Sequence, residues 1–214
     1  MGDAGGGMAK RAQDYAAVRD WTGYFRAVLG KGPRETLVAA LEAFEKEGRV
    51  PGDAVDLACG EGRDTLELLR RGWRVHALDG SEDGVTHLMS RVVTEWRDRL
   101  RVEVATFDRM RWGPARLVNC SYSLPFCEPG HFAGVWGRIV DSIEPGGRFA
   151  GQLFGDRDTW AAIADRSHQT EAQARELLRP FELEMFKVEE KDDADALGVV
   201  KHWHVFHVVG RKKG

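Results

Sequence analysis

The sequence predicts an α/β fold built on a doubly wound, Rossmann-like sheet of seven strands with helices on both faces. A short apolar strand at 55–58 runs into a glycine turn at Gly60 and Gly62 and then directly into a helix. A second apolar strand ends at Asp79, about twenty residues later, which is the spacing of a nucleotide-binding βαβ unit. Strands and helices then alternate as far as two final strands, which we expect to form an antiparallel hairpin on an otherwise parallel sheet.

The helices are predicted from apolar periodicity and from end signals. Leu37, Val38, Leu41 and Phe44 recur at helical spacing after Pro33. Ser81 is a good N-cap, and Thr170 with Gln173 resembles a capping box. We expect helices within 9–32 and at 33–48, 63–71, 82–96, 131–143 and over much of 158–179.

The strands are predicted where short apolar or alternating runs end at a turn signal. The last two are expected to be joined by the acidic turn 190–198. The predicted strands after the first are 73–78, 100–107, 115–120, 148–153, 181–189 and 199–209.

The glycine turn indicates a ligand site. Gly60 and Gly62 permit positive φ, and they lack the Cβ atoms that would hold a flat ligand away from the backbone. Asp56 has two open roles, because it can brace the N–H groups of the turn or contact an amino group of the ligand. Asp79 lies where a carboxylate meets the ribose of a nucleotide, and helix capping does not require it because Ser81 supplies a cap.

These motifs resemble those of the class I S-adenosylmethionine-dependent methyltransferases. The family's acidic residue followed by G-x-G is matched by 56–62, its ribose-binding acid by Asp79, and its acid near the adenine by Asp108. The continuations at 62–65 and 124–127 resemble small-molecule members, including the tellurite-resistance type. The resemblance runs from about Trp21 to the C-terminus.

The resemblance implies S-adenosylmethionine as cofactor, S-adenosylhomocysteine as product, and methyl transfer to a small-molecule acceptor by in-line displacement. Two of the implied roles have alternatives, because Asp108 can instead pair with a neighbouring arginine and Arg63 can be an exposed first-turn residue. The implied cofactor residues are Trp21, Asp56, Ala58, Gly60, Gly62, Arg63, Asp79, Gly80, Ser81, Phe107, Asp108, Cys120 and Ser121.

Apolar and aromatic residues near the predicted mouth, at 124–126, Phe154 and Trp160, indicate an acceptor that is small and partly apolar. A general base is needed only if the accepting atom starts protonated. His131 and Tyr122 are the candidate catalytic residues; His131 has a suitable intrinsic pKa, although it also sits at a helix start.

Two other classes of protein remain as alternatives. An NAD(P)-dependent oxidoreductase is disfavoured because its third fingerprint glycine is replaced by Thr65, and Asp64 just before it would repel a diphosphate. A protein that binds the methyl donor without turnover has the same motifs and stays open.

The chain is predicted to divide into three parts. Residues 1–8 are expected to be a flexible leader or a cloning remnant, 9–48 a helical lid, and 49–214 the methyltransferase domain. The aromatic residues of the lid, among them Trp21 and Tyr24, either pack on the sheet or cover the cofactor.

Composition limits the partners. A formal charge of −3 over 214 residues gives no general attraction to nucleic acid. No apolar run reaches the length of a membrane span, and three cysteines without a CxxC pair fit a reducing, cytoplasmic setting. We expect no metal, because His202 and His204 share one strand face and His207 takes the other. The chain is expected to be a monomer or a homodimer.

Overall fold

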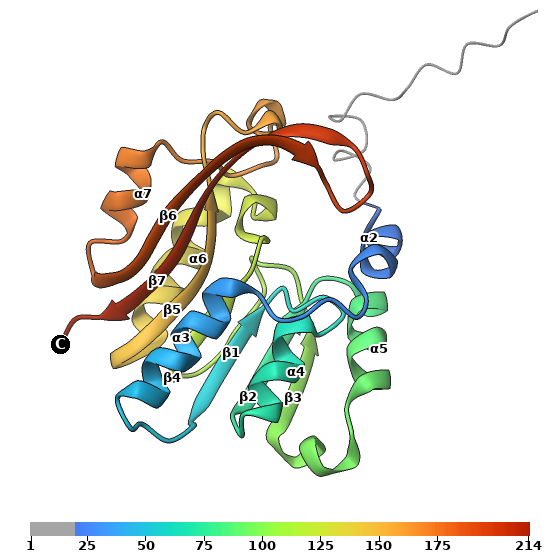
Figure 1. The fold of residues 1–214 in the computed structure, drawn as a ribbon, viewed down its shortest axis with the longest axis vertical. Coiled ribbons are helices and arrows are strands. Elements are labelled where there is room, and N and C mark those ends of the chain that lie inside the picture. Colours follow the sequence, from blue (N-terminus) through green and yellow to red (C-terminus); the bar gives the residue numbers. More distant parts are fainter. Residues whose placement is uncertain (1–19) are drawn as a thin grey trace, which may run out of the picture.

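The computed structural model describes residues 20–214, so the predicted leader 1–8 and residues 9–19 lie outside the described residues. At its centre is a seven-stranded sheet of order β3-β2-β1-β4-β5-β7-β6 (Figure 1). The strands from β1 to β5 pair in parallel, whereas β7 runs antiparallel to both β5 and β6. The predicted sheet and C-terminal hairpin are therefore confirmed. The strands are β1 (Asp53–Leu57), β2 (Arg74–Asp79), β3 (Leu100–Val104), β4 (Ala115–Cys120), β5 (Ile143–Phe154), β6 (Phe181–Ala194) and β7 (Val200–Lys212).

Helices cover both faces of this sheet. Apolar side chains of α3, α4 and α5 form one buried cluster with the sheet, and those of α6 and α7 form another on the opposite face. Helix α2 lies beyond the carboxyl edge of the sheet and contacts α5. The helices are α2 (Trp21–Val28), α3 (Glu35–Lys46), α4 (Arg63–Arg70), α5 (Glu82–Arg91), α6 (Pro129–Ser142) and α7 (Glu171–Leu177), with short 3₁₀ turns at η1 (Thr94–Arg99), η2 (Leu124–Phe126) and η3 (Thr159–Ala162).

Local signals set several element ends. The Ser81 side chain accepts a hydrogen bond from the Gly84 N–H at the start of α5. The capping box of α7 is complete, because Thr170 and Gln173 each bond the other's backbone. These ends were predicted from the sequence, because a cap needs only a few consecutive residues.

Two predicted helices are shorter in the structure. The helix expected to reach about Trp96 ends at Arg91, because Val92 is extended and buried in the core. The helix expected over 158–179 is reduced to η3 and α7. Between these two, the Ser167 and Gln169 N–H groups donate to Pro125 and Phe154, so the backbone bonds to neighbouring segments instead of to itself.

The C-terminal hairpin is longer than predicted. The acidic segment expected to be a turn is mostly strand, since Glu190 pairs with His204 and Asp192 pairs with His202. The turn is confined to 195–199, where the Asp195 carboxylate accepts hydrogen bonds from the Leu197 and Val199 N–H groups. Figure 1 shows this extended hairpin curving beyond the carboxyl edge of the sheet toward α2.

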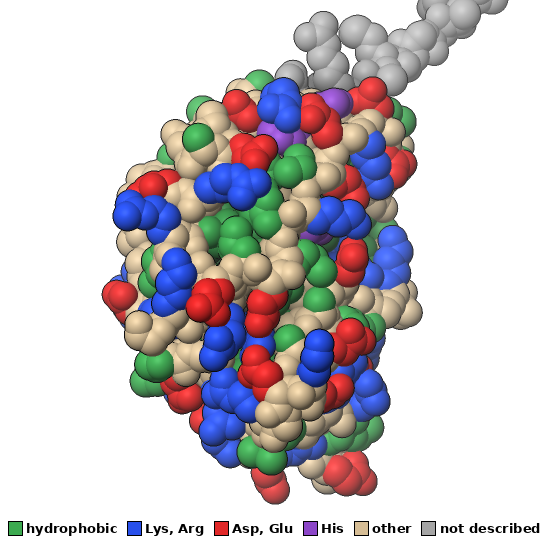
Figure 2. All heavy atoms as spheres, turned by 60° about the vertical axis from the view of Figure 1, so that its left-hand side comes forward, with side chains coloured by type: hydrophobic (Ala, Val, Ile, Leu, Met, Phe, Trp, Pro, Cys, Tyr) green, Lys and Arg blue, Asp and Glu red, His purple; other side chains and the backbone are tan. Residues whose placement is uncertain are grey.

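The surface has mixed charge. On the face drawn in Figure 2, acidic and basic side chains are interspersed and the hydrophobic side chains form small patches between them. Within residues 20–214, no helix combines the length and the apolar character that crossing a membrane requires.

A buried arginine joins one helix to two strands. The Arg148 guanidinium on β5 is fully buried and bonds Glu184 of β6 at 2.7 Å and Glu47, just after α3, at 2.5 Å. Its Cζ atom also lies 4.3 Å from the centre of the Phe44 ring. Loss of this side chain would leave two carboxylates without their shared partner.

We expect Arg148→Ala to lower the free energy of unfolding by about 3 kcal/mol, the lower end for a broken buried pair because both glutamates are partly exposed. Thermal unfolding followed by circular dichroism should show a decrease of about 6–12 °C in Tm. Arg211→Ala is the matched control, because Arg211 is 42% exposed and lies 3.9 Å from the same Glu47. Equal decreases in the two variants would contradict the role given to Arg148.

Candidate active site

A cavity of about 730 Å³ opens at the carboxyl ends of the parallel strands. This is where open α/β sheets bind ligands, and the volume is typical of a small-molecule site. The glycine turn after β1 and the ends of β2 and β4 line one side, and α2 and the tip of the β6–β7 hairpin line the other.

The backbone of the glycine turn is left-handed at three positions, with φ of 53° at Ala58, 54° at Gly60 and 86° at Gly62. A Cβ atom at Gly62 would lie 2.4 Å from Leu88 Cδ1, and one at Gly60 would lie 3.1 Å from Phe25 Cε1. The two glycines therefore permit the turn and the close packing of α5 and α2 on it. The missing Cβ atom at Gly62 makes room for Leu88, and close approach of a ligand to the two glycines stays a prediction.

Asp79 at the end of β2 fixes the turn. One carboxylate oxygen accepts a hydrogen bond from the Gly60 N–H at 2.7 Å, and the other accepts one from the Ser81 N–H at 2.7 Å. Asp79 is 7% exposed yet lines the cavity; burial raises the pKa of its carboxyl group, and the two N–H groups oppose the shift. Each oxygen keeps a second lone pair with which it can accept a hydrogen bond from a ligand.

Two further carboxylates are buried beneath the turn. Asp56 accepts hydrogen bonds from the Thr65 hydroxyl at 2.5 Å and from the Asn119 amide at 2.8 Å. The same Asn119 nitrogen donates to Asp64 at 3.0 Å, and the Ser121 hydroxyl donates to Asp64 at 2.6 Å. Burial first, and then the nearby charge of Asp64, raise the pKa of Asp56 to about 7. Asp56 thus ties β1 to α4 and β4 from below the cavity floor.

Tyr122, just after β4, is held in a strained conformation with φ of 55°. Its N–H donates to the Gln152 side chain at 2.8 Å, and Gln152 in turn donates to the Thr36 hydroxyl at 3.0 Å. The Arg34 guanidinium lies 4.3 Å from the ring centre. Such strain persists only where the surroundings hold it in place. Burial raises the pKa of Tyr122, so its phenol is a neutral hydrogen-bond donor at pH 7.

One side of the cavity is aromatic. Neighbouring ring centres form a continuous chain from Trp21 to Tyr122, with separations between 4.8 and 6.4 Å. All of these rings line the cavity. We call this surface the aromatic wall; it consists of Trp21, Tyr122, Phe126, Phe154, Trp160 and Trp203.

Residues 54–147, which contain the glycine turn and Asp79, match a family model described as a methyltransferase domain. The matched part of the chain is a methyltransferase domain, as its resemblance to the class I S-adenosylmethionine-dependent methyltransferases predicted. The resemblance seen in the sequence is thereby confirmed. A comparison with curated protein sequences gives no match.

Solved structures of methyltransferases share the fold. TehB from Haemophilus influenzae is 15% identical with a TM-score of 0.67 over 81% of this chain, which spans 61% of TehB. Magnesium protoporphyrin IX methyltransferase (ChlM) from Synechocystis PCC 6803 is 14% identical with a TM-score of 0.66, and the match covers 94% of this chain and 98% of ChlM. The 1,6-didemethyltoxoflavin-N1-methyltransferase of Burkholderia thailandensis is 22% identical with a TM-score of 0.65, covering 100% of this chain and 94% of that enzyme.

Most predicted site residues of this methyltransferase meet in the one cavity. Three do not line it: Asp56 lies beneath the floor, Gly62 faces Leu88, and the Cys120 thiol points to the Ser123 hydroxyl at 3.3 Å. Burial raises the pKa of Cys120 to about 12. Those that line the cavity are Trp21, Ala58, Gly60, Arg63, Asp79, Gly80, Ser81, Phe107, Asp108, Ser121, Tyr122 and His131.

The two candidate catalytic residues lie in different surroundings. His131 is exposed in the first turn of α6, and its charge contributes to lowering the pKa of Asp108, after the larger effect of a hydrogen bond from Thr106. His131 therefore belongs with the residues predicted to face the adenine. Tyr122 is part of the aromatic wall.

Sequence reasoning missed several residues of this site. Arg34 lies over Tyr122, and Asp64 and Asn119 support the floor. Glu189, Lys191 and Asp193 line the cavity from β6, one on every second residue. Their alternation is a strand signal, but Lys191 and Asp193 fell inside the segment predicted to be a turn, and Glu189 ended the predicted strand.

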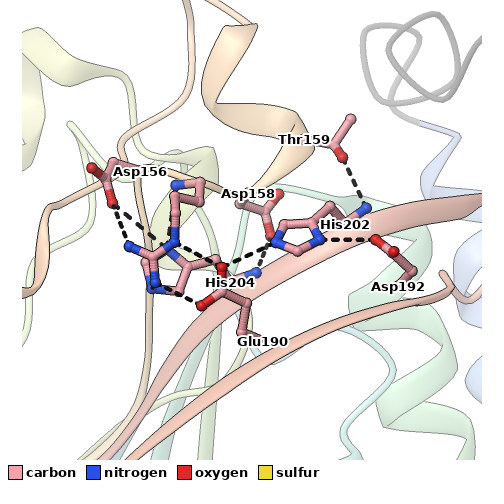
Figure 3. Close-up of polar contacts among 8 residues, drawn as sticks. Asp156, Asp158, Thr159, Glu190, Asp192, His202 and His204 are labelled. Atoms are coloured by element: carbon pink, nitrogen blue, oxygen red, sulfur yellow. Dashed lines mark hydrogen bonds and ion pairs between the residues drawn. The ribbon is translucent and has the colours of Figure 1, made fainter.

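The C-terminal histidines do not converge on a common point. His202 bonds Asp192 at 2.8 Å (Figure 3). The His204 ring lies 3.0 Å from the Arg157 guanidinium. His207, on the opposite face of β7, lies 3.7 Å from Glu189. Across residues 20–214, no group of three or more His, Cys, Asp or Glu side chains is arranged to hold a metal ion.

We expect Asp56→Asn to become more stable relative to the unmodified protein as pH rises from 5 to 8. Because folding raises the pKa of the Asp56 carboxyl group, this group stabilises the fold fully at pH values below its ordinary pKa of 3.8. The stabilisation is lost as the pH rises through about 7, the pKa in the folded protein. The variant has no buried charge to form, so its relative gain is on the order of 2 kcal/mol, or about 4–8 °C in Tm. Thermal unfolding at both pH values measures the gain.

Asp53→Asn is the control for this prediction. Asp53 begins the same strand, but it is exposed and its hydrogen bond with Arg74 lowers its pKa. It should therefore gain no stability between pH 5 and pH 8. A Tm difference between Asp56→Asn and the unmodified protein that is the same at both pH values would refute the raised pKa of Asp56.

Proposed function

We propose that the cavity binds S-adenosylmethionine across the glycine turn and that the enzyme transfers its methyl group to a small-molecule acceptor lying against the aromatic wall. The observation that carries this proposal is Asp79. Its buried carboxylate borders the cavity at the end of β2 and is already oriented by two N–H groups. A carboxylate held in this way can accept hydrogen bonds from both hydroxyls of a ribose without further ordering.

The charges around the turn fit a cationic ligand. Asp56, Asp64 and Asp79 all lie at or beneath it, and the methyl donor carries a sulfonium and an ammonium group but no phosphate. A dinucleotide would place its diphosphate over these carboxylates. Thr65 replaces the third fingerprint glycine, and its hydroxyl donates to Asp56, so the turn is built around a buried acid. This arrangement supports the methyl donor over NAD(P).

When bound, S-adenosylmethionine supplies a sulfonium methyl group that an electron-rich atom attacks in line, and the thioether leaves. The protein therefore has to align the two reactants and exclude water. We assign Phe107 and Asp108 to the adenine end and Arg63 to the methionine carboxylate. Helix α2 closes the cavity over the turn, since Phe25 packs on Gly60 and the Trp21 ring lies 4.8 Å from that of Phe126.

On the acceptor side we assign the contact with the reacting group to Tyr122. Its phenol borders the cavity and is neutral at pH 7, so it can donate a hydrogen bond to the acceptor. His131 stands beside Asp108, among the residues assigned to the adenine. We therefore do not assign it as a general base for the acceptor.

We expect Asp79→Ala to weaken binding of S-adenosylhomocysteine by about 100-fold or more. Charge-assisted hydrogen bonds contribute about 1.5–3 kcal/mol each, and each 1.4 kcal/mol is a factor of ten. Isothermal titration calorimetry measures the affinity, and circular dichroism shows whether the variant is folded. Asp98→Ala, at an exposed position in η1, should bind as the unmodified enzyme does. Unchanged affinity in folded Asp79→Ala would remove Asp79 from the site.

Turnover is tested with S-adenosylmethionine labelled in its methyl group and a panel of small-molecule acceptors. The expected result is stoichiometric formation of S-adenosylhomocysteine and a labelled product. Binding of the cofactor without product over the whole panel would favour a non-catalytic binding protein. Displacement of S-adenosylhomocysteine by NADPH would favour the oxidoreductase.

A further inference from the structure

A buried ion pair that the proposed function does not use lies behind the aromatic wall. The side chains of Lys201 on β7 and Asp158 after β5 are both 0% exposed and are in direct contact. The Lys201 ammonium lies 3.9 Å from the ring centre of Trp160 and 3.8 Å from that of Trp203. Both rings line the cavity and Lys201 does not, so the ammonium lies on the side of the rings away from the cavity.

Asp158 also ties together the two segments that carry these tryptophans. One of its oxygens accepts a hydrogen bond from the Trp160 N–H at 2.9 Å, and the other accepts one from the His204 N–H at 3.2 Å. Next to it, the Thr159 hydroxyl accepts the His202 N–H at 2.9 Å. Figure 3 shows Asp158 and Thr159 meeting the backbone of β7 in this way. The first part of the loop after β5 is therefore attached to β7.

A buried ion pair is seldom needed for stability, because apolar side chains of similar volume often stabilise a fold as well. Here the pair serves orientation. An ammonium is attracted to the electron-rich face of an aromatic ring, so Lys201 holds Trp160 and Trp203 at the same time. Phe154 joins this arrangement, since its ring lies within 9° of parallel to that of Trp160. The wall is thus a set of flat surfaces in fixed orientations.

Fixed flat surfaces select ligands by shape. A planar ring system gains stacking or edge-to-face contacts beyond the apolar area that it buries, and a puckered aliphatic ring does not. Lys201 also selects by charge. Burial lowers its pKa to about 8, so it is still cationic at pH 7, and its charge behind the rings opposes a second cation on their cavity side. A neutral or electron-rich ring meets no such repulsion.

We propose that the methyl acceptor is a planar, uncharged or electron-rich aromatic or heteroaromatic molecule that stacks on Trp160 and Trp203, with the Lys201–Asp158 pair as the positioning device for these rings. The proposal rests on the proposed function, because it concerns the acceptor part of the same cavity. Tyr122, Glu189 and Lys191 border that part and supply the polar contacts for the edge of such a ring.

The test compares two alcohols with the same carbon skeleton, 1-naphthol and decahydro-1-naphthol. Their dissociation constants are measured by calorimetry on enzyme saturated with S-adenosylhomocysteine. We expect the flat naphthol to bind at least about tenfold more tightly than the saturated alcohol. Equal binding of the two, or tighter binding of decahydro-1-naphthol, would overturn the proposal.

Variants then locate the preference in the wall. Trp160→Leu and Trp203→Leu should bring the ratio of the two dissociation constants close to one, whereas Trp203→Phe should keep most of it. Trp112→Leu is the control, because Trp112 lies outside the cavity and bonds Ser142. A ratio unchanged in both leucine variants would place the aromatic preference elsewhere and refute the assignment.

Lys201→Met tests whether Lys201 positions the two tryptophans. The ratio of the two dissociation constants again distinguishes this role from a purely structural one. The expected result is an affinity for S-adenosylhomocysteine within about twofold of the unmodified enzyme, with the naphthol preference reduced towards one. A lower Tm with the preference intact would show that Lys201 only stabilises the fold. Should this variant not fold, the tryptophan variants still decide the proposal. Failure of the unmodified protein to bind S-adenosylhomocysteine would refute the proposed function instead.

Discussion

The two hydrogen bonds that Asp79 accepts from the Gly60 and Ser81 N–H groups are the contact on which the site depends. They join the loop after β1 to the loop after β2 across the parallel pair of strands. Left-handed backbone at Ala58, Gly60 and Gly62 brings the turn back toward β2, and the carboxylate holds it there. The cavity floor is therefore defined by a charge–amide contact rather than by apolar packing.

This arrangement concentrates acid at one edge of the sheet. Asp56 and Asp64 lie below the turn with Asn119 donating to both, and Asp79 lies beside it. Burial raises the pKa of Asp56, and the nearby charge of Asp64 raises it further, so holding these carboxylates together is costly. An enzyme whose cofactor carries positive charge gains from a negative floor, whereas a phosphate-binding site would not.

The upper part of the cavity comes from segments that are distant in the sequence. Helix α2, the loop after β5 and the tip of the β6–β7 hairpin all contribute side chains to it. Asp158 and Lys201 join two of these segments, and the contact of Trp21 with Phe126 connects α2 to the same surface. The floor and the upper part of the cavity are thus built from different segments of the chain.

The sequence alone determined the sheet, the glycine turn and Asp79, because strand periodicity, helix caps and a turn of fixed spacing are encoded in neighbouring residues. It did not determine the end of α5, the loss of helix between η3 and α7, or the length of the hairpin. There the backbone finds partners in other segments, as when Ser167 and Gln169 bond Pro125 and Phe154. Lys201 shows the same limit: in the sequence it is one lysine in a polar strand, and only the approach of the loop after β5 places it between two tryptophans with Asp158 as its partner. Contacts between distant segments depend on how the whole chain packs, and no local pattern contains that information.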